Sequence, residues 1–441
     1  MLEPEGRQLL LDALRPPTGY ELEHAVGTTY SLDLMSLLVA PLGFALFDRE
    51  ASDGRLIADP IALIEAVRRH AERIDVFCQA GQIAVPREHR AIVAYLESSV
   101  HGVVPPNPEA IFHPKVWVIR YRRAEDGLRT YRLLCLSRNL TFDRSWDTLL
   151  RMEGEAKTDG SGDSRLSEFI LRLPDLCVPG GITDRRSNVI RQLADELRSV
   201  VFVPPDGFDR AAFWPLGFDP GTWPFEGRVD RLLVMSPFLT KGCLTRLAAN
   251  RRSDVVVSRP EAFDLLGGSA LAGLAETMVM SPTALAQETV DSDPTTGEAA
   301  ITAEEAIAER AGVQLRGLHA KLYVADAPWR ARLWTGSANA TDAAFGGNVE
   351  FLVELEGPKR CCGIDAIVGE RQAGVGLRKL LEPYRPTSDD PRQLTLAERL
   401  ERRLDAVRRA VARLAFVATI RPDDKDTYHL ALHISPGPDV P

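Results

Sequence analysis

The chain has 441 residues, of which 45% are hydrophobic and 26% charged, and its formal net charge is −9. This composition is that of a soluble globular protein with two or three hydrophobic cores, and the negative charge counts against indiscriminate binding to polyanions. The six cysteines show no CxxC spacing, the N-terminus shows no basic leader with an apolar core, and the longest apolar stretch, 34–47, is too short to span a bilayer. We therefore expect a cytoplasmic protein with no disulfide framework, no metal or other cofactor, and no membrane contact.

In the first half of the chain, helix-like and strand-like stretches alternate up to a turn-rich break at 179–181. An apolar strand is expected at 75–79. Three polar landmarks then stand beside strand-like runs: His113-Pro114-Lys115 before 116–119, Ser137-Arg138-Asn139-Leu140-Thr141 after 133–136, and Asp147 within 146–150.

The second half repeats this order of elements. The strand-like run 254–258 answers 75–79, and the same three landmarks follow: His319-Ala320-Lys321 before 322–325, Gly336-Ser337-Ala338-Asn339-Ala340-Thr341 after 332–335, and Glu350 within 349–353. Short repeats indicate solenoids, but one long duplication predicts two similar lobes, with a shared site at the seam between them. The expected fold is α/β, with two pseudo-symmetric lobes that are each a mixed β-sheet flanked by helices.

Between the copies, 187–198 has the apolar periodicity of a helix, and 204–227 is rich in Pro, Gly, Phe and Trp, as in an ordered connector. A polar loop at 286–299 and a helix at 301–311 are expected before the second triplet. Near the C-terminus, a charged helix at 394–414 precedes two strand-like runs, 416–420 and 427–434, a small α+β segment that resembles the start of a module cut short. We divide the chain into a first lobe (1–185), a connector (186–228), a second lobe (229–357) and a C-terminal segment (358–441).

The two His-x-Lys triplets are improbable by chance. Only 7 of the 53 basic residues are lysines and there are 8 histidines, so random placement would give about 8 × 7 / 441, or ~0.13, such triplets. Two occur, in matching contexts. In a chain that otherwise uses arginine for positive charge, Lys115 and Lys321 are indicated as functional residues.

Cleavage of a phosphodiester without a metal needs a nucleophile, an acid for the leaving oxygen, and fixed positive charge. A histidine can be nucleophile or acid because its pKa lies near neutrality. Residues i and i+2 of a strand share a face, so each lysine is expected beside its histidine, neutralising the phosphate. The remaining expected roles are amide donors to the phosphate (Asn139, Asn339), hydroxyl donors (Ser137, Ser337) and carboxylates that hold a histidine ring (Asp147, Glu350).

The order of these parts resembles the phospholipase D superfamily, whose signature is His-x-Lys-x4-Asp followed by Gly-Ser-x-Asn. The second copy matches it at His319, Lys321, Asp326, Gly336, Ser337 and Asn339. In the first copy, Arg120 stands in place of the Asp and Leu136 in place of the Gly. The tyrosyl-DNA phosphodiesterase branch of the superfamily also lacks that Asp.

The resemblance implies a covalent phosphohistidine mechanism, with His113 as nucleophile and His319 as general acid. It favours a metal-independent nuclease that acts on DNA or RNA, of a kind that includes bacterial anti-phage proteins with helicase partners. A lipid phosphodiesterase, or a scaffold or nucleic-acid-binding subunit with a decayed first motif, are the alternatives. Asp326 is expected either to take part in the site or only to brace the second lobe.

Several neighbouring residues allow two interpretations each. Trp117 and Tyr323 either pack in the core or floor the cleft, with packing favoured. Lys241 and Arg259 either line the cleft or face solvent. The arginines near the motifs either form a wall that tracks phosphates or are scattered solvated charges. They are Arg120, Arg122, Arg138, Arg144, Arg330 and Arg332.

Overall fold

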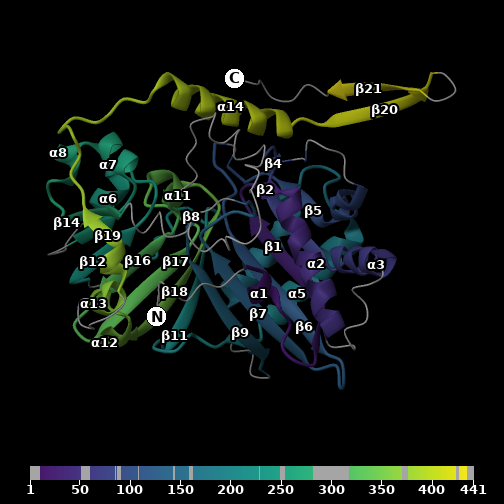
Figure 1. Cartoon of the computed structure of the whole chain (residues 1–441), viewed down its shortest axis with the longest axis horizontal. Helices are drawn as coiled ribbons and strands as arrows, with labels where there is room; N and C mark the ends of the chain where they lie inside the picture. The colour runs from purple at the N-terminus through teal and green to yellow at the C-terminus, as the bar shows by residue number, and fades with distance from the viewer. Residues whose placement is uncertain are drawn as a thin grey trace, which may run out of the picture.

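The structure is a computed structural model that describes residues 10–50, 60–84, 86, 91–107, 109–142, 145–157, 162–227, 229–248, 254–281, 317–369, 376–423 and 427–434. The expected loop at 286–299 and the expected helix at 301–311 lie outside these residues, as does Arg144. Two large mixed β-sheets stand side by side, each flanked by helices (Figure 1). The two-lobed α/β architecture expected from the duplication is confirmed.

The first sheet has seven strands and the second has eight. In spatial order, the first sheet contains β10 (Val200–Phe202), β9 (Leu149–Ala156), β7 (Arg129–Leu136), β6 (Val116–Arg123), β1 (Tyr20–Thr29), β3 (Ile74–Gln79) and β5 (Val100–Val103). The second contains β11 (Arg210–Leu216), β18 (Glu350–Pro358), β17 (Arg330–Gly336), β16 (Leu322–Asp326), β12 (Arg231–Met235), β13 (Asp254–Val257), β14 (Glu276–Met280) and β19 (Leu381–Pro383). Apart from the added β19, the two orders match strand for strand.

Helices cover both sheets. Those of the first lobe are α1 (Leu10–Leu14), α2 (Leu34–Glu50), α3 (Pro60–Ala71), the 3-10 helices η2 (Ala91–Ser99) and η3 (Leu173–Leu176), α4 (Ser164–Arg172) and α5 (Asp184–Leu197). Those of the second are α6 (Lys241–Ala248), α7 (Pro260–Leu266), α8 (Gly268–Leu271), α11 (Asp342–Gly346), α12 (Lys359–Cys362), α13 (Ile364–Val368) and the 3-10 helix η5 (Leu377–Leu380). The helix expected at 187–198 is α5, which starts three residues earlier because the Thr183 hydroxyl accepts a hydrogen bond from the backbone N–H of Arg186.

The connector is shared between the lobes. Its helix α5 packs on α4, and β10 extends the first sheet, whereas β11 extends the second. The ring of Phe213 in β11 lies 5.8 Å from Phe202 of β10 and 6.2 Å from Phe351 of β18, and Phe351 lies 4.9 Å from Phe169 of α4. The largest hydrophobic cluster therefore runs through both lobes, which fixes one lobe against the other.

Trp117 and Tyr323 belong to the hydrophobic core of their own lobes and not to a cleft. Both are fully buried, in the two clusters on the outer sides of the sheets. The ring of Trp117 also explains a glycine: a Cβ at Gly27 on the neighbouring strand β1 would lie 2.9 Å from that ring. The interpretation as core residues is confirmed.

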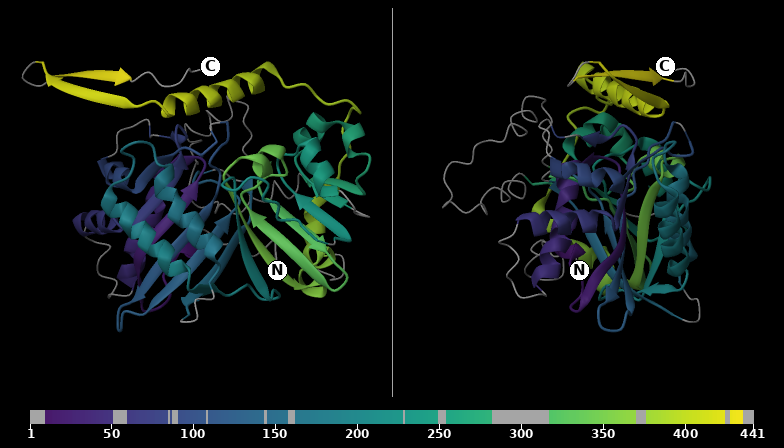
Figure 2. Two further views of the ribbon diagram at one scale, coloured as in Figure 1. Left: turned by 180° about the vertical axis from the view of Figure 1, so that it is seen from behind. Right: turned by 90° about the vertical axis from the view of Figure 1, so that its right-hand side faces the viewer.

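Beyond the second sheet, the chain forms an arm of one helix and one hairpin. The helix α14 (Leu396–Ala412) is followed by β20 (Phe416–Pro422) and β21 (Tyr428–Ile434), close to the expected bounds. Thr395 and Glu398 start the helix with a capping box. Figures 1 and 2 show α14 lying along one edge of both lobes, with the hairpin extending past the first lobe.

Buried residues of opposite charge form ion pairs within β6, at Arg120, and at the end of β16, at Asp326. Arg120, in place of the signature Asp, is 4% exposed and lies 3.1 Å from Glu23 and 2.8 Å from Glu196. Asp326 is fully buried, accepts the N–H of Ile364, and lies 3.4 Å from the Lys359 ammonium. Each residue braces its own lobe, about five strand residues or ~17 Å from the nearer lysine of the triplets. Arg120 is therefore a charge-reversed counterpart of Asp326.

We expect Arg120→Ala to destabilise the protein by about 1–3 kcal/mol, because it removes a buried guanidinium shared by Glu23 and Glu196 and leaves Arg129 as their remaining cation. Urea unfolding followed by circular dichroism measures this. The matched control is Arg122→Ala, whose exposed ion pair with Glu21 should be without measurable effect. A variant that keeps its stability but loses substrate affinity would show that Arg120 contacts substrate instead.

Candidate active site

Each triplet is held by the opposite lobe. Phe112 bridges Val349 in parallel fashion, and the N–H of His113 donates to the Val349 carbonyl at 2.8 Å. In the mirror arrangement, β15 (Gly317–Leu318) pairs with β8 (Ser145–Trp146), and the N–H of His319 donates to the Trp146 carbonyl, also at 2.8 Å. Glu350 and Asp147 follow these two carbonyls directly. The backbone thus places one carboxylate of each lobe beside the histidine of the other.

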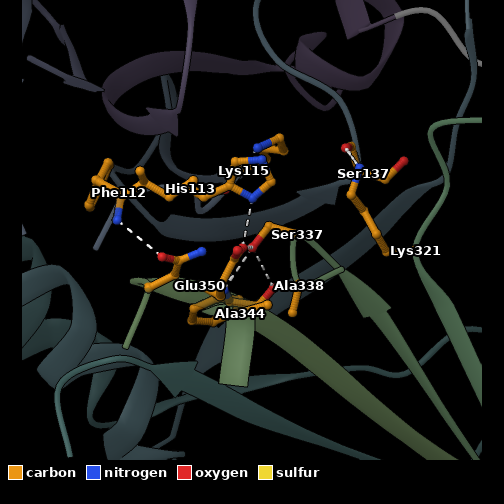
Figure 3. A network of polar contacts seen from close by, with 12 residues as sticks. Phe112, His113, Lys115, Ser137, Lys321, Ser337, Ala338, Ala344 and Glu350 are labelled. Carbon is orange, nitrogen blue, oxygen red and sulfur yellow. Dashed lines mark hydrogen bonds and ion pairs between the residues drawn. The ribbon is translucent and has the colours of Figure 1, made fainter. Parts of the chain in front are cut away.

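Glu350 makes this contact. Its Oε2 lies 2.9 Å from Nδ1 of His113, and the hydroxyl of Ser337 donates to the same oxygen (Figure 3). His113 is 8% exposed and Glu350 is 1% exposed. The Ser337 hydroxyl also accepts the N–H of Phe351 at 2.9 Å. Ser337 therefore positions Glu350, and its expected role as a hydroxyl donor to substrate is corrected.

Ser137 is engaged in the same way in the first lobe. Its hydroxyl accepts the N–H of Thr148 at 2.8 Å, and the residue is fully buried. Its hydroxyl lies 3.5 Å from the Thr148 carbonyl, and its expected role as a hydroxyl donor to substrate stays a prediction. The lobes pack closely at Gly336, where the Cβ of any other residue would lie 2.2 Å from the Phe351 carbonyl and 3.2 Å from Cys135 of the other lobe.

Lys321 contacts its own histidine. Its ammonium lies 3.1 Å from Nδ1 of His319, 2.7 Å from the His319 carbonyl and 3.1 Å from the Ser137 carbonyl of the first lobe. An ammonium has three protons, so these acceptors use all of them. Lys115 donates to the His113 carbonyl at 2.8 Å. Both lysines are buried and each contacts its own histidine, as expected, while their role in neutralising a phosphate stays a prediction.

The partners on Nδ1 fix opposite tautomers in the two neutral rings. Lys321 can only donate, so Nδ1 of His319 accepts and the ring proton is on Nε2. The carboxylate of Glu350 accepts, so Nδ1 of His113 carries the proton and Nε2 keeps its lone pair. One ring therefore offers a lone pair and the other a proton, which are the two functions needed to displace an alkoxide from phosphorus.

Burial and charge shift all three titrating groups of the site. Burial, with Lys115 and Lys321 nearby, lowers the pKa of His113 well below its usual value. Burial, Lys321 and Lys115 lower the pKa of His319 in the same direction, and Arg259 contributes. Burial raises the pKa of Glu350 to about 8, although Lys115, Ser337 and Lys321 oppose the rise. Both imidazoles are therefore neutral near pH 7, but the Glu350 carboxylate that fixes the His113 tautomer predominates only above about pH 8.

Asn139 and Asn339 occupy equivalent points in the two lobes. The buried Oδ1 of each has no hydrogen-bond partner among the described residues. Buried amide groups are normally satisfied, and the O and N of an asparagine side chain can exchange by a flip. These two amides are therefore the groups near the triplets whose hydrogen-bonding capacity a ligand could meet.

Asp147 does not copy Glu350. Its Oδ2 lies 3.2 Å from Nε of Arg138, whereas Nδ1 of His319 contacts Lys321. Asp147 is one methylene shorter than Glu350 at the equivalent position. Both carboxylates were expected to hold a histidine. Glu350 does so, whereas Asp147 forms an ion pair with Arg138 and Nδ1 of His319 contacts Lys321 instead.

Two further residues hold the positions just before the histidines. Gln79 accepts the N–H of Phe112 at 2.7 Å, and Arg259 donates to the Leu318 carbonyl at 2.7 Å. Gln79 ends β3 and Arg259 follows β13, so the duplication places them at equivalent points. Of the two interpretations of Arg259, cleft lining agrees with this contact. The role of Gln79 was not expected from the sequence, although its position at the end of a repeated strand was a usable signal.

Two aromatic residues flank the site, Tyr30 in the loop after β1 and Phe238 in the loop after β12. The ring of Tyr30 lies 5.5 Å from that of His113, and the guanidinium of Arg259 lies 5.5 Å from the ring of Phe238. Phe238 is 50% exposed, although its backbone is fixed by the Ser236 hydroxyl, which donates to its carbonyl at 2.7 Å. Neither ring was expected at the site from the sequence.

The chain is similar in course to two kinds of solved structure. One is a mutant of yeast tyrosyl-DNA phosphodiesterase, with 11% identity and a TM-score of 0.44 over 85% of this chain and 93% of that one. The other is polyphosphate kinase from Porphyromonas gingivalis, with 12% identity and a TM-score of 0.40 over 91% of this chain, which spans about half (51%) of the kinase. No family model and no curated protein matches. Likenesses this distant do not bear on activity.

Glu350 is expected to control the pH dependence of any reaction at this site. Below about pH 8 the His113–Glu350 pair holds an extra proton, and its loss restores the carboxylate that keeps the lone pair on Nε2. We expect kcat/KM to rise with pH through about 8. Glu350→Gln should remove this limb and reduce kcat by about 10³–10⁴, because an amide N–H facing Nδ1 favours the wrong tautomer.

The matched control is Asp147→Asn, which makes the same change at the equivalent position. Since His319 contacts Lys321, we expect a loss of less than about tenfold and an unchanged pH limb. Equal losses in the two variants, measured as kcat/KM against pH, would contradict the asymmetry of the two histidines.

Proposed function

We propose that the protein is a phosphodiesterase, and specifically a metal-independent nuclease that forms a phosphohistidine intermediate. The observation that carries this proposal is the difference between the two Nδ1 contacts, Glu350 at His113 and Lys321 at His319, from which a lone pair on His113 and a proton on His319 are inferred. A site that used both histidines only for binding would need no such difference. The phospholipase D resemblance implies the same chemistry.

In the first step, Nε2 of His113 attacks phosphorus and forms the N–P bond while the P–O bond to the leaving group breaks. The leaving oxygen takes the Nε2 proton of His319, and the Lys321 ammonium passes a proton to Nδ1 of that ring, leaving a neutral amine. This relay is needed because a neutral imidazole is a weak acid by itself. The contact of 3.1 Å between Nζ and Nδ1 supports it.

In the second step, water attacks phosphorus and gives a proton to Nε2 of His319, while Nδ1 returns its proton to Lys321. The N–P bond breaks, and its electron pair goes back to His113. Glu350 stabilises the charge on the phosphorylated ring. Asn139 and Asn339 are proposed to donate their amide N–H groups to the phosphoryl oxygens, where negative charge accumulates.

Nucleic acid is the proposed substrate, and single strands are favoured. Most described arginines of the expected phosphate-tracking wall pair with carboxylates: Arg120, Arg122, Arg138 and Arg330. A broad field for duplex DNA is thus weak, and affinity has to come from a few contacts. Phe238 and Arg259 beside His319 suit a base and a neighbouring phosphate, because stacking contributes about 1–3 kcal/mol per base. A helicase partner in anti-phage defence is proposed from the resemblance alone.

The lipid phosphodiesterase alternative has one observation in its favour, the apolar residues exposed on α14. No described helix has the length and apolar character needed to cross a membrane. Release of choline from phosphatidylcholine vesicles, at a rate above that of nucleic acid cleavage, would favour this alternative. The scaffold alternative rested on Arg120, and the ion pairs of that residue account for it without decay of the site.

We expect cleavage of single-stranded DNA or RNA to persist in EDTA, and His113→Ala and His319→Ala each to reduce it by about 10³ or more. Activity that requires an added metal would refute the proposed chemistry. If both variants keep full activity, the site is vestigial.

The roles of the two histidines can be separated with a p-nitrophenyl ester of a nucleotide, whose leaving group needs no acid. We expect His319→Ala to give a burst of p-nitrophenol and a covalent phosphohistidine on His113, because attack proceeds but water is not activated. His113→Ala should give neither. Mass spectrometry under alkaline conditions detects the adduct, and an adduct found only in His113→Ala would reverse the assignment.

Phe238→Ala is expected to raise KM for a single-stranded oligonucleotide about tenfold through lost stacking, with kcat/KM for bis(p-nitrophenyl) phosphate unchanged. The matched control is Trp329→Ala, since Trp329 is 86% exposed in the turn between β16 and β17, at the end of these strands away from the triplets. Equal effects of the two substitutions would argue against a base platform at Phe238.

A further inference from the structure

The arm formed by α14, β20 and β21 has an unusual surface. Twelve of the 19 large hydrophobic side chains exposed in the described part of the chain lie between Leu396 and Ile434. They include Leu400 and Leu404 on α14, at 56% and 50% exposure, and Ile420 and Leu432 on the hairpin, at 65% and 61%. Soluble monomers rarely expose a contiguous apolar area of this extent.

The helix packs on the body with its polar side. Asp405 accepts hydrogen bonds from Tyr30 and Gln82, and the Arg408 carbonyl and Ala412 lie against Gly81. At 100° per residue, Leu400, Leu404, Val407 and Val411 fall on the side away from Asp405. Figures 1 and 2 show no described element on that outer side.

The outward side has the spacing of a coiled-coil seam. Leu400, Leu404, Val407, Val411 and Leu414 are separated by alternating steps of 4 and 3 residues. This is the heptad pattern in which one helix receives another of the same kind. The apolar character of the helix is therefore arranged for a helical partner, and not spread evenly around its circumference.

We propose that this surface binds a second copy of the chain, with the two α14 helices antiparallel. In a pair centred between Asp405 and Ala406, Leu404 of one copy meets Val407 of the other, and Leu400 meets Val411. Glu401 then lies beside Arg408, twice per dimer. A parallel pair would instead place Arg403 beside Arg408, with like charges opposed. The helix is thus complementary to itself in one orientation only.

The hairpin that follows α14 carries an exposed apolar face of its own. Phe416, Ile420, Leu430, Leu432 and Ile434 occupy one face, because Phe416 pairs with Ile434 and Ile420 pairs with Leu430 across the strands. An isolated hairpin is marginal in water unless such a face is covered. With roughly 80–100 Å² from each of the eleven exposed side chains other than Val417, which lies on the opposite face of the hairpin beside His433, the arm offers about 1,000 Å² of apolar surface per copy, compared with the ~800 Å² of a standard stable interface.

Sedimentation velocity of the full chain at about 1–50 µM is expected to show a dimer. The double variant Leu404→Glu, Val411→Glu should be a monomer. Its Tm and its rate of hydrolysis of bis(p-nitrophenyl) phosphate should be unchanged. The matched control is Leu128→Glu, at a 52% exposed leucine in the β6–β7 turn, which should stay dimeric. The proposal is overturned if the wild-type protein is a monomer at 50 µM, or if the variant with both Leu404→Glu and Val411→Glu is still a dimer.

A charge exchange tests the orientation. Glu401→Arg and Arg408→Glu should each weaken the dimer about tenfold, because each affects two pairs, and their combination should restore it. Failure to restore excludes the antiparallel self-pairing. A wild-type monomer that co-sediments with vesicles of phosphatidylcholine and phosphatidylglycerol, and loses this with Leu404→Glu and Val411→Glu, would assign the arm to a membrane instead and overturn the proposal.

Discussion

The candidate site depends on one exchange of backbone hydrogen bonds between the lobes. The N–H of His113 reaches the Val349 carbonyl, and the N–H of His319 reaches the Trp146 carbonyl, so each histidine takes its position from the other half of the chain. A strand contact of this kind is short and directional. Because Glu350 follows Val349 in the sequence, the contact also places Glu350 beside His113. Neither lobe by itself could hold its histidine in this position, because the backbone partner of each histidine comes from the other lobe. The hydrophobic core shared by the lobes therefore has a function, which is to keep the two histidines aligned with these partners.

Small differences within this near-symmetry separate the two histidines. Glu350 and Asp147 differ by one methylene, and the shorter residue lies against Arg138. Gln79 and Arg259 hold equivalent backbone positions, but only Arg259 brings a charge close to His319. In a site with two identical histidines, one ring would have to become the lone-pair donor and the other the proton donor in each catalytic cycle. Fixing one ring as a lone-pair donor and the other as a proton donor removes that requirement.

The sequence was informative where local patterns decide the outcome. The order of elements, the two triplets, the core positions of Trp117 and Tyr323 and the pairing of Glu350 with a histidine all followed from spacing and from the duplication. The errors concern contacts between segments distant in sequence. Nothing local to Arg120 indicates Glu196, and nothing near Lys321 indicates the Ser137 carbonyl 184 residues away. The expected role of Ser337 failed for a similar reason, because its hydroxyl donates to Glu350 and accepts the N–H of Phe351, and the positions of both partners depend on sheet register.

The charges buried in the site explain why a phosphodiester suits it. With Glu350 ionised, Lys115, Lys321 and Glu350 sum to +1 + 1 − 1 = +1, and all three side chains are at most 2% exposed. A net charge in so dry an environment is costly unless a partner offsets it. A diester monoanion brings the sum to zero, whereas a duplex backbone would add charges that the carboxylate-paired arginines cannot balance. The same net charge keeps both imidazoles neutral before substrate arrives, and a bound anion would favour the protonated form of His319 at the moment when the leaving oxygen needs a proton.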